Sequence, residues 1–204
     1  MGYAATFHGD YGETQLQITE RANRRAQAPD YGWVAKALHW IAFAVLAAQF
    51  GVGWMMPHIG RDTLKEGWVA WHLSIGIALL FLFVGRYVWR LTHPVAFPAD
   101  LSLWQNRLAH ITHLALYLLV IGNTLLGWAA AGFRGWSLSF LGIVPMPSLA
   151  EKGTAWAHTA GDIHVVLVYV LLGLAGLHAA AALYHYFITR DGILQRMLFN
   201  SAKQ

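Results

Sequence analysis

Four long stretches without Asp, Glu, Lys or Arg divide this chain, and they constrain its fold more than any other feature. They cover residues 37–60, 67–85, 108–133 and 163–189. Each is long enough to supply the roughly 20 apolar residues that a transmembrane helix needs. Charged residues make up 12% of the chain, against roughly 25% in an ordinary soluble domain. The sequence therefore predicts an all-α integral membrane protein, a four-helix up-down bundle.

The remaining segments are interpreted as a loop and two tails. A fifth uncharged stretch, 135–150, is shorter and contains Pro145 and Pro147, so we expect an interfacial or re-entrant loop there. Residues 1–30 are polar and lack the charged start and apolar run of a secretory signal, which predicts a cytoplasmic N-terminal tail. The transmembrane domain is expected at 31–198 and a C-terminal tail at 199–204.

The basic residues predict the orientation of the spans. Ten of the 14 Lys and Arg residues flank the spans on the side that holds both chain ends, and four lie on the other side: Arg61, Lys65, Arg134 and Lys152. Positive charge near span ends marks the cytoplasmic side, so we expect both termini in the cytoplasm. This placement, with a net charge of only +4, favours the lipid bilayer over nucleic acid as a partner.

Histidines are the unusual feature of the predicted bundle. The chain has eleven histidines and no cysteine, so any metal must be bound by nitrogen or oxygen. Polar groups are costly in hydrocarbon and usually face the bundle interior. In the last span His164, His178 and His185 are separated by 14 and 7 residues, close to whole numbers of helical turns. These three histidines therefore share one helix face.

Up-down topology then predicts two histidine pairs. His72 is level with His164 near the outer face, whereas His39, near the inner face, can meet either His178 or His185. Counting residues from the flanking charges favours His185. Two imidazoles on opposite helices are what a six-coordinate, non-covalent haem needs. We expect two bis-histidine haems b that exchange single electrons, because both axial positions of each iron are filled.

Four motifs surround these histidines: YGWVAKALHW at 31–40, WHLSIG at 71–76, LAHITHLALY at 108–117, and HAAAALYHYF followed by RDGILQRM at 178–197. Over about residues 30–198 the chain resembles the bacterial cytochrome b561 family of four-helix di-haem inner-membrane proteins. The resemblance implies that His39 and His178 bind an inner haem and that His72 and His164 bind an outer one. It also implies electron transfer involving ubiquinone and, in the best-studied members, oxidation of superoxide at the outer face.

Further polar residues lie at the inner ends of the spans and are candidates for contact with quinone or with haem propionates: Arg86, Arg90, His110, His113 and His185. For the two arginines, propionate or headgroup contact is favoured over quinone contact. Reduction of a quinone consumes protons, which histidine can deliver near neutral pH. At the outer face, Arg134 is the first candidate to steer an anion such as superoxide, since no acidic residue is near it in sequence.

Two other functions fit the same sequence. The chain could be the haem-bearing membrane anchor of a larger oxidoreductase, of the hydrogenase or formate dehydrogenase type, with a redox partner protein. It could also be a transporter whose intramembrane histidines bind a metal or relay protons. A b-type haem spectrum distinguishes the transporter from the other two, and a co-purifying polypeptide identifies the anchor.

Overall fold

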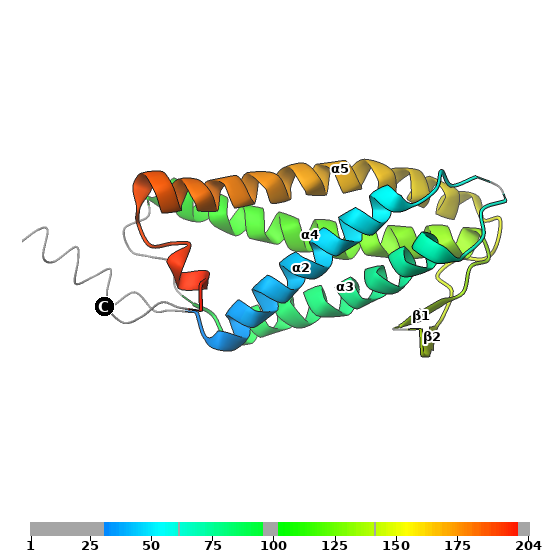
Figure 1. Cartoon of the computed structure of the whole chain (residues 1–204), viewed down its shortest axis with the longest axis horizontal. Coiled ribbons are helices and arrows are strands. Elements are labelled where there is room, and N and C mark those ends of the chain that lie inside the picture. Colours follow the sequence, from blue (N-terminus) through cyan, green and yellow to red (C-terminus); the bar gives the residue numbers. More distant parts are fainter. Residues whose placement is uncertain (1–30, 61, 96–101, 141, 200–204) are drawn as a thin grey trace, which may run out of the picture.

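The part of the chain that the structure describes folds into a bundle of four long helices (Figure 1). The computed structural model describes residues 31–60, 62–95, 102–140 and 142–199. The predicted N-terminal tail at 1–30 and all but Phe199 of the predicted C-terminal tail at 199–204 therefore lie outside the described residues. The helices are α2 (Trp33–Met55), α3 (Gly67–Thr92), α4 (Leu103–Phe133) and α5 (Ala155–Tyr184). All four are long and apolar enough to cross a membrane. The predicted all-α membrane bundle is confirmed.

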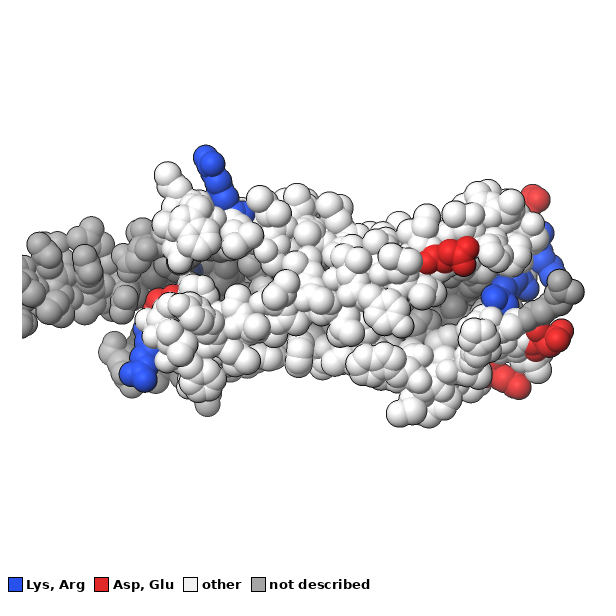
Figure 2. Space-filling view, turned by 90° about the horizontal axis from the view of Figure 1, so that it is seen from above, with Lys and Arg blue, Asp and Glu red and all other residues white. Residues whose placement is uncertain are grey.

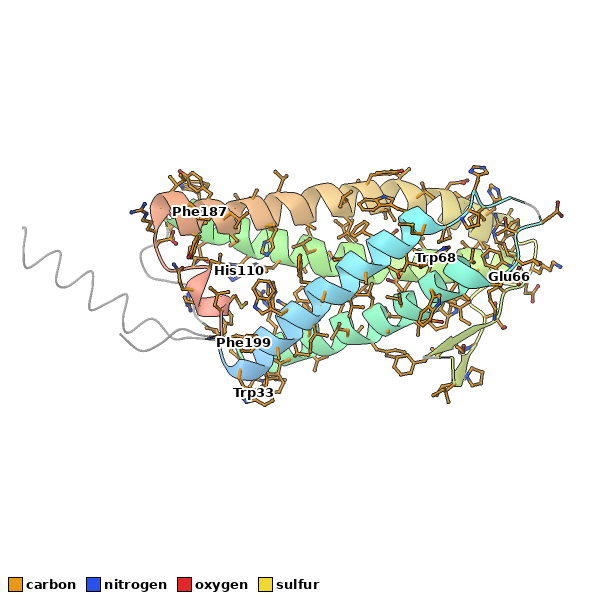
Figure 3. The ribbon with its side chains drawn as sticks, in the orientation of Figure 1. Trp33, Glu66, Trp68, His110, Phe187 and Phe199 are labelled. Atoms are coloured by element: carbon orange, nitrogen blue, oxygen red, sulfur yellow. The ribbon has the colours of Figure 1, made fainter. Side chains whose placement is uncertain are left out.

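Trp33 and Glu66 mark the two ends of the bundle, and we name the ends after them. Trp33, His110, Phe187 and Phe199 lie at the Trp33 end, and Glu66 and Trp68 lie at the Glu66 end (Figure 3). In Figure 2 the Lys, Arg, Asp and Glu side chains gather toward the two ends, and a broad middle zone of the face in view has none. This distribution suits a molecule whose middle lies in hydrocarbon and whose ends reach water.

The helices pack as two close pairs, α4 with α5 and α2 with α3, and α3 also packs against α4. Small residues bring α4 and α5 together: Ala129, Ala157 and Ala160 are buried in one cluster, as is usual where membrane helices approach closely. A second buried core, which includes Leu79 and Tyr117, draws residues from all four helices. The helix pair α2 and α5 is not among those in close contact.

The segment 135–150 contains a β-hairpin, which the sequence did not predict. Strand β1 (Leu138–Phe140) pairs antiparallel with β2 (Val144–Met146). Leu138 is buried with residues of α3, and the Phe140 ring lies 5.0 Å from that of Phe81, so the hairpin folds back along this helix. Pro145 occupies a strand without a further neighbour, where its missing N–H costs nothing. The predicted interfacial loop therefore has regular structure, held by α3.

The C-terminal segment folds back over the start of α2. After α5 the chain makes a π-helical turn (His185–Thr189), adopts a left-handed conformation at Arg190, and forms a short 3₁₀ turn (Gln195–Met197). Lys36 Nζ then donates a hydrogen bond to the Leu198 carbonyl (2.9 Å), and Trp40 Nε1 donates to the Met197 carbonyl (2.8 Å). Lys36, only 5% exposed, is thus buried inside the protein.

Candidate haem sites

One histidine pair lies toward the Glu66 end of the bundle. The rings of His72, on α3, and His164, on α5, have their centres 6.1 Å apart and their planes at 89°. Both rings line a cavity of about 650 Å³ that all four helices enclose and that extends to His58 and Arg134 at the Glu66 end. Helix packing thus brings together two residues 92 positions apart in the chain.

The hydrogen bond of His164 identifies the nitrogen that can bind a metal. His164 Nδ1 lies 2.8 Å from the backbone carbonyl oxygen of Asn123. Because a carbonyl oxygen can only accept, Nδ1 carries the proton and Nε2 carries the lone pair. A hydrogen bond of this kind commonly orients the imidazoles that bind metals in proteins. Gly127, one turn further along α4, leaves the space in which the ring sits, because a Cβ there would be 3.0 Å from two ring atoms.

The second pair lies toward the Trp33 end. His39, on α2, and His178, on α5, have ring centres 6.4 Å apart and planes at 70°. The ring of His113, on α4, packs against that of His178 with centres 5.3 Å apart. Arg86 is close enough to act electrostatically on all three rings, and its Nε donates to the Tyr117 hydroxyl (2.9 Å). This end therefore gathers three imidazoles and a guanidinium within the bundle.

Comparison with known proteins identifies the family. The family model described as prokaryotic cytochrome b561 matches residues 30–200. The chain belongs to this family. It is 33% identical to "Cytochrome b561 homolog 2" of Escherichia coli over 84% of this chain and 93% of that protein. It is also 28% identical to "Probable superoxide oxidase CybB" of Yersinia pestis (82% and 95%) and 29% identical to "Cytochrome b561 homolog 1" of E. coli (79% and 92%).

Membership of the cytochrome b561 family makes the chain a bacterial membrane protein that binds b-type haem and carries electrons. Both histidine pairs fit such a group. A metal–imidazole bond of about 2.0 Å, plus about 1.2 Å from nitrogen to ring centre, puts two axial rings about 6.4 Å apart. The observed separations are 6.1 and 6.4 Å. At the Glu66 end, the cavity also contains buried polar atoms that have no partner among the described residues, including His72 Nδ1 and Asn123 Oδ1.

The remaining predicted site residues of this cytochrome b561 lie at the Trp33 end, and their surroundings differ from one another. Arg90 acts electrostatically on His113, whose Nδ1 donates to the Ala109 carbonyl. His110 is exposed on α4, and its Nδ1 donates to the Asn106 carbonyl (2.9 Å). The structure thus brings Arg86 and His113 to the ring of His178, places Arg90 near His113, and leaves His110 on the surface of α4.

His185 does not face His39, contrary to the residue count from the flanking charges. Its Nδ1 is hydrogen-bonded to the carboxylate of Asp191, and the Thr189 hydroxyl donates a hydrogen bond to the same carboxylate oxygen. Burial acts to raise the pKa of Asp191, but the hydrogen bonds from His185, the Ile193 N–H and Thr189 outweigh it and hold that pKa below its usual range. The ring opposite His39 is that of His178, the one implied by the family resemblance.

Gln49 and Asn123 are site residues that the sequence interpretation missed. Both line the cavity at the Glu66 end, Asn123 through its 5% exposed side chain and Gln49 through an amide beside His72. A signal was present, because each is an uncharged polar residue within a predicted span, where such groups are expected to face the bundle interior.

Proposed function

We propose that the chain passes single electrons across the bacterial inner membrane, from superoxide on the outer side to ubiquinone near the inner side, through two haems b. His72 and His164 would bind the outer haem, and His39 and His178 the inner one. The observation that carries the proposal is the pair of imidazole separations, 6.1 and 6.4 Å. Because His164 and His178 are 14 residues apart in α5, the two sites lie about 21 Å apart along that helix.

The two histidine pairs limit the chemistry. When bound there, haem supplies one-electron exchange, since two imidazoles leave its iron no open position. The ligands come from rigid helices rather than loops, so their positions change little during turnover. Three long helices therefore hold a fixed relay: α2 and α3 each supply one imidazole, and α5 supplies one to each site.

The Glu66 end is the proposed outer side. Ten of the 14 basic residues flank the spans at the opposite end, which predicts that the Trp33 end is cytoplasmic. Arg134 Nη1 donates to the Gly60 carbonyl (2.8 Å) at the mouth of the cavity, where its charge would attract an anion. The relative from Yersinia pestis, named as a probable superoxide oxidase, supports superoxide as the donor.

Ubiquinone is placed at the Trp33 end, beside His178. Two superoxide ions each give up one electron and become dioxygen, and ubiquinone takes up both electrons and two protons to become ubiquinol. His113, which contacts the His178 ring, is the proposed proton donor, and Arg86 and Arg90 are proposed to hold the quinone oxygens or the haem propionates. The protons come from the cytoplasmic side under this arrangement.

The test is stopped-flow spectroscopy on the purified chain. Pyridine haemochrome analysis should give two haems b per chain. After rapid mixing, superoxide should reduce both haems on the time scale of the stopped-flow measurement. A short-chain ubiquinone should then reoxidise the haems and yield ubiquinol. The control is His93→Ala, because the His93 ring stacks on Trp89, away from both sites. One haem per chain, or haems that superoxide does not reduce, would overturn the proposal, and turnover only with a co-purifying polypeptide would identify a membrane anchor subunit.

A further inference from the structure

Arg86 is the residue of α3 that lies level with the inner histidine pair. Helices α3 and α5 run in the same direction along the bundle, and His72 of the first faces His164 of the second. Arg86 follows His72 by 14 residues, the same interval that separates His178 from His164. Since 14 residues are close to four helical turns, Arg86 shares a face of α3 with His72. Where α5 presents a second imidazole, α3 therefore presents a guanidinium.

The phenol of Tyr117, on α4, holds this guanidinium inside the bundle. Arg86 Nε donates a hydrogen bond to the Tyr117 hydroxyl (2.9 Å). Tyr117 is only 6% exposed and belongs to the core that draws on all four helices. Its ring packs against Phe83 and Tyr87 of α3, with ring centres 6.0 and 5.2 Å apart. The acceptor of the hydrogen bond is therefore fixed in place by its own packing.

The position of Tyr117 opposes the usual behaviour of an arginine near the end of a membrane helix. A long basic side chain in such a place normally extends toward the headgroups. Tyr117 lies one turn beyond His113, in the direction of the bundle middle. The buried core that contains Tyr117 also contains Leu171, which is midway along α5 between the two proposed ligands of that helix. The hydrogen bond therefore draws the guanidinium toward the middle of the bundle, away from the headgroups.

The charge held by Tyr117 acts on the inner site. The guanidinium is close enough to act electrostatically on the rings of His39, His178 and His113. Its hydrogen bond to the phenol uses no nitrogen of these rings, so it is compatible with iron bound by His39 and His178. Only Nε is occupied, and both Nη groups remain for the propionate or quinone contacts proposed above. Among the described residues that line the outer cavity, the one Lys or Arg is Arg134, at its mouth.

We propose that Tyr117 is a positioning residue: its hydroxyl holds the Arg86 guanidinium beside the inner haem, where the positive charge raises the reduction potential of that haem. The inference rests on the proposed function, because it requires His39 and His178 to be haem ligands. Reduction of such a haem removes one positive charge from the iron, so a fixed cation nearby favours the reduced form, and more strongly in a medium of low dielectric constant. The inner haem is then the better acceptor, and electrons pass to it from the outer one.

Potentiometric titration of the purified holoprotein tests the proposal. Arg86→Gln removes the charge and should lower the inner potential by about 59 mV, a tenfold change in a one-electron equilibrium. Tyr117→Phe keeps the ring and the charge but releases the guanidinium, so it should lower the same potential by about 28 mV, a roughly threefold change. The outer haem, about 21 Å away along α5, should keep its potential in both variants.

The double variant shows whether Tyr117 acts through Arg86. If it does, Tyr117→Phe should have no further effect once Arg86→Gln is present. The matched control is Tyr87→Phe, which removes the hydroxyl of a ring that contacts Tyr117 and should leave both potentials unchanged. Arg86→Lys keeps a charge on a stem without Nε, so it should reproduce the smaller fall. It takes the place of Tyr117→Phe if that variant does not retain both haems.

The possible results separate the inference from the proposed function. The inner haem is identified as the one lost in both His39→Ala and His178→Ala. An inner potential that keeps its wild-type value in Arg86→Gln or in Tyr117→Phe would overturn the positioning role, as would a fall in the double variant equal to the sum of the two single falls. The proposed function would stand in each case. If the two histidine variants remove different haems or none, the ligand assignment itself is wrong, and the inference falls with it.

Discussion

Adding one methyl group to Gly127 should weaken the outer haem site without changing either proposed ligand. A Cβ at this position would lie 3.0 Å from both Cε1 and Nδ1 of His164. Non-bonded carbon atoms prefer about 3.5–4.0 Å, so the ring must withdraw by about 0.5 Å. The ring cannot withdraw without cost, because its Nδ1 is hydrogen-bonded to the Asn123 carbonyl of α4, the helix that also carries Gly127.

The magnitude follows from comparison with a second glycine of α4. Overpacking a well-packed interior costs about 1–3 kcal/mol, while replacing glycine by alanine within a helix returns up to about 1 kcal/mol. A Cβ at Gly122 meets nothing within 4 Å, so Gly122→Ala reports the helix term alone. The difference between Gly127→Ala and Gly122→Ala should therefore be about 1–3 kcal/mol, or about 5-fold to 150-fold in affinity for the outer haem.

The assay is the rate of haem loss from each purified variant to an excess of a haem-scavenging protein, with thermal unfolding measured in parallel. Gly127→Ala should lose one of two haems faster than wild type, and Gly122→Ala should match wild type. If Gly127→Ala retains both haems at the wild-type rate and unfolds at the same temperature as Gly122→Ala, the ring of His164 is not confined as described, and the reasoning fails.

Four further outcomes are expected. Alanine at any one of the four proposed ligands should remove one haem or leave it five-coordinate and high-spin, while His93→Ala should keep the wild-type pyridine haemochrome value. A reporter active only in the periplasm, fused after Gln204, should be silent, and strong activity would reverse the proposed orientation. Neutralising Arg134 should lower the rate of haem reduction by superoxide several-fold and remove part of its salt dependence, because screening acts beyond about 8 Å at physiological ionic strength; an unchanged, salt-independent rate would argue against steering. The pKa of Asp191 is lowered in the folded chain, so its ionised carboxylate helps to hold residues 190–199. That contribution is present above the ordinary pKa near 3.9 and is lost as the pH falls through the lowered value. In limited proteolysis, Asp191→Asn should therefore be cut faster than wild type at pH 7 and at the same rate in strong acid.

Sequence periodicity predicted the histidine pair His72 and His164, and residue counting chose the wrong neighbour for His39. The count took Lys36 as the membrane boundary, as is usual for a basic residue near a span end. In the structure Lys36 is buried and donates to the Leu198 carbonyl, and α2 begins at Trp33. His39 therefore lies nearly two turns into its helix, level with His178. A contact to a residue 162 positions away is not visible in local sequence.

The hairpin and the polar partners escaped prediction for related reasons. Strands of three residues are too short for an alternating pattern, and β1 forms because the α3 side chains Ile77 and Leu80 cover Leu138. Pro145 and Pro147 correctly argued against a fifth span, since proline interrupts a helix. Gln49 was visible as a polar residue in an apolar stretch, but only the arrangement of α2 against α3 shows that His72 is its partner.

The loose association of α2 with α5 also bears on how such a chain is assembled. In hydrocarbon, helices gain little from burying apolar surface and depend on close packing instead. The pairs α2 with α3 and α4 with α5 have that packing, so each can form as an independent helical hairpin after insertion, with α3 against α4 as their main direct contact. The proposed imidazole pairs both join one hairpin to the other. Haem bound at these pairs would add two links to the buried core that already joins the two hairpins, so loss of haem should loosen the bundle without separating them.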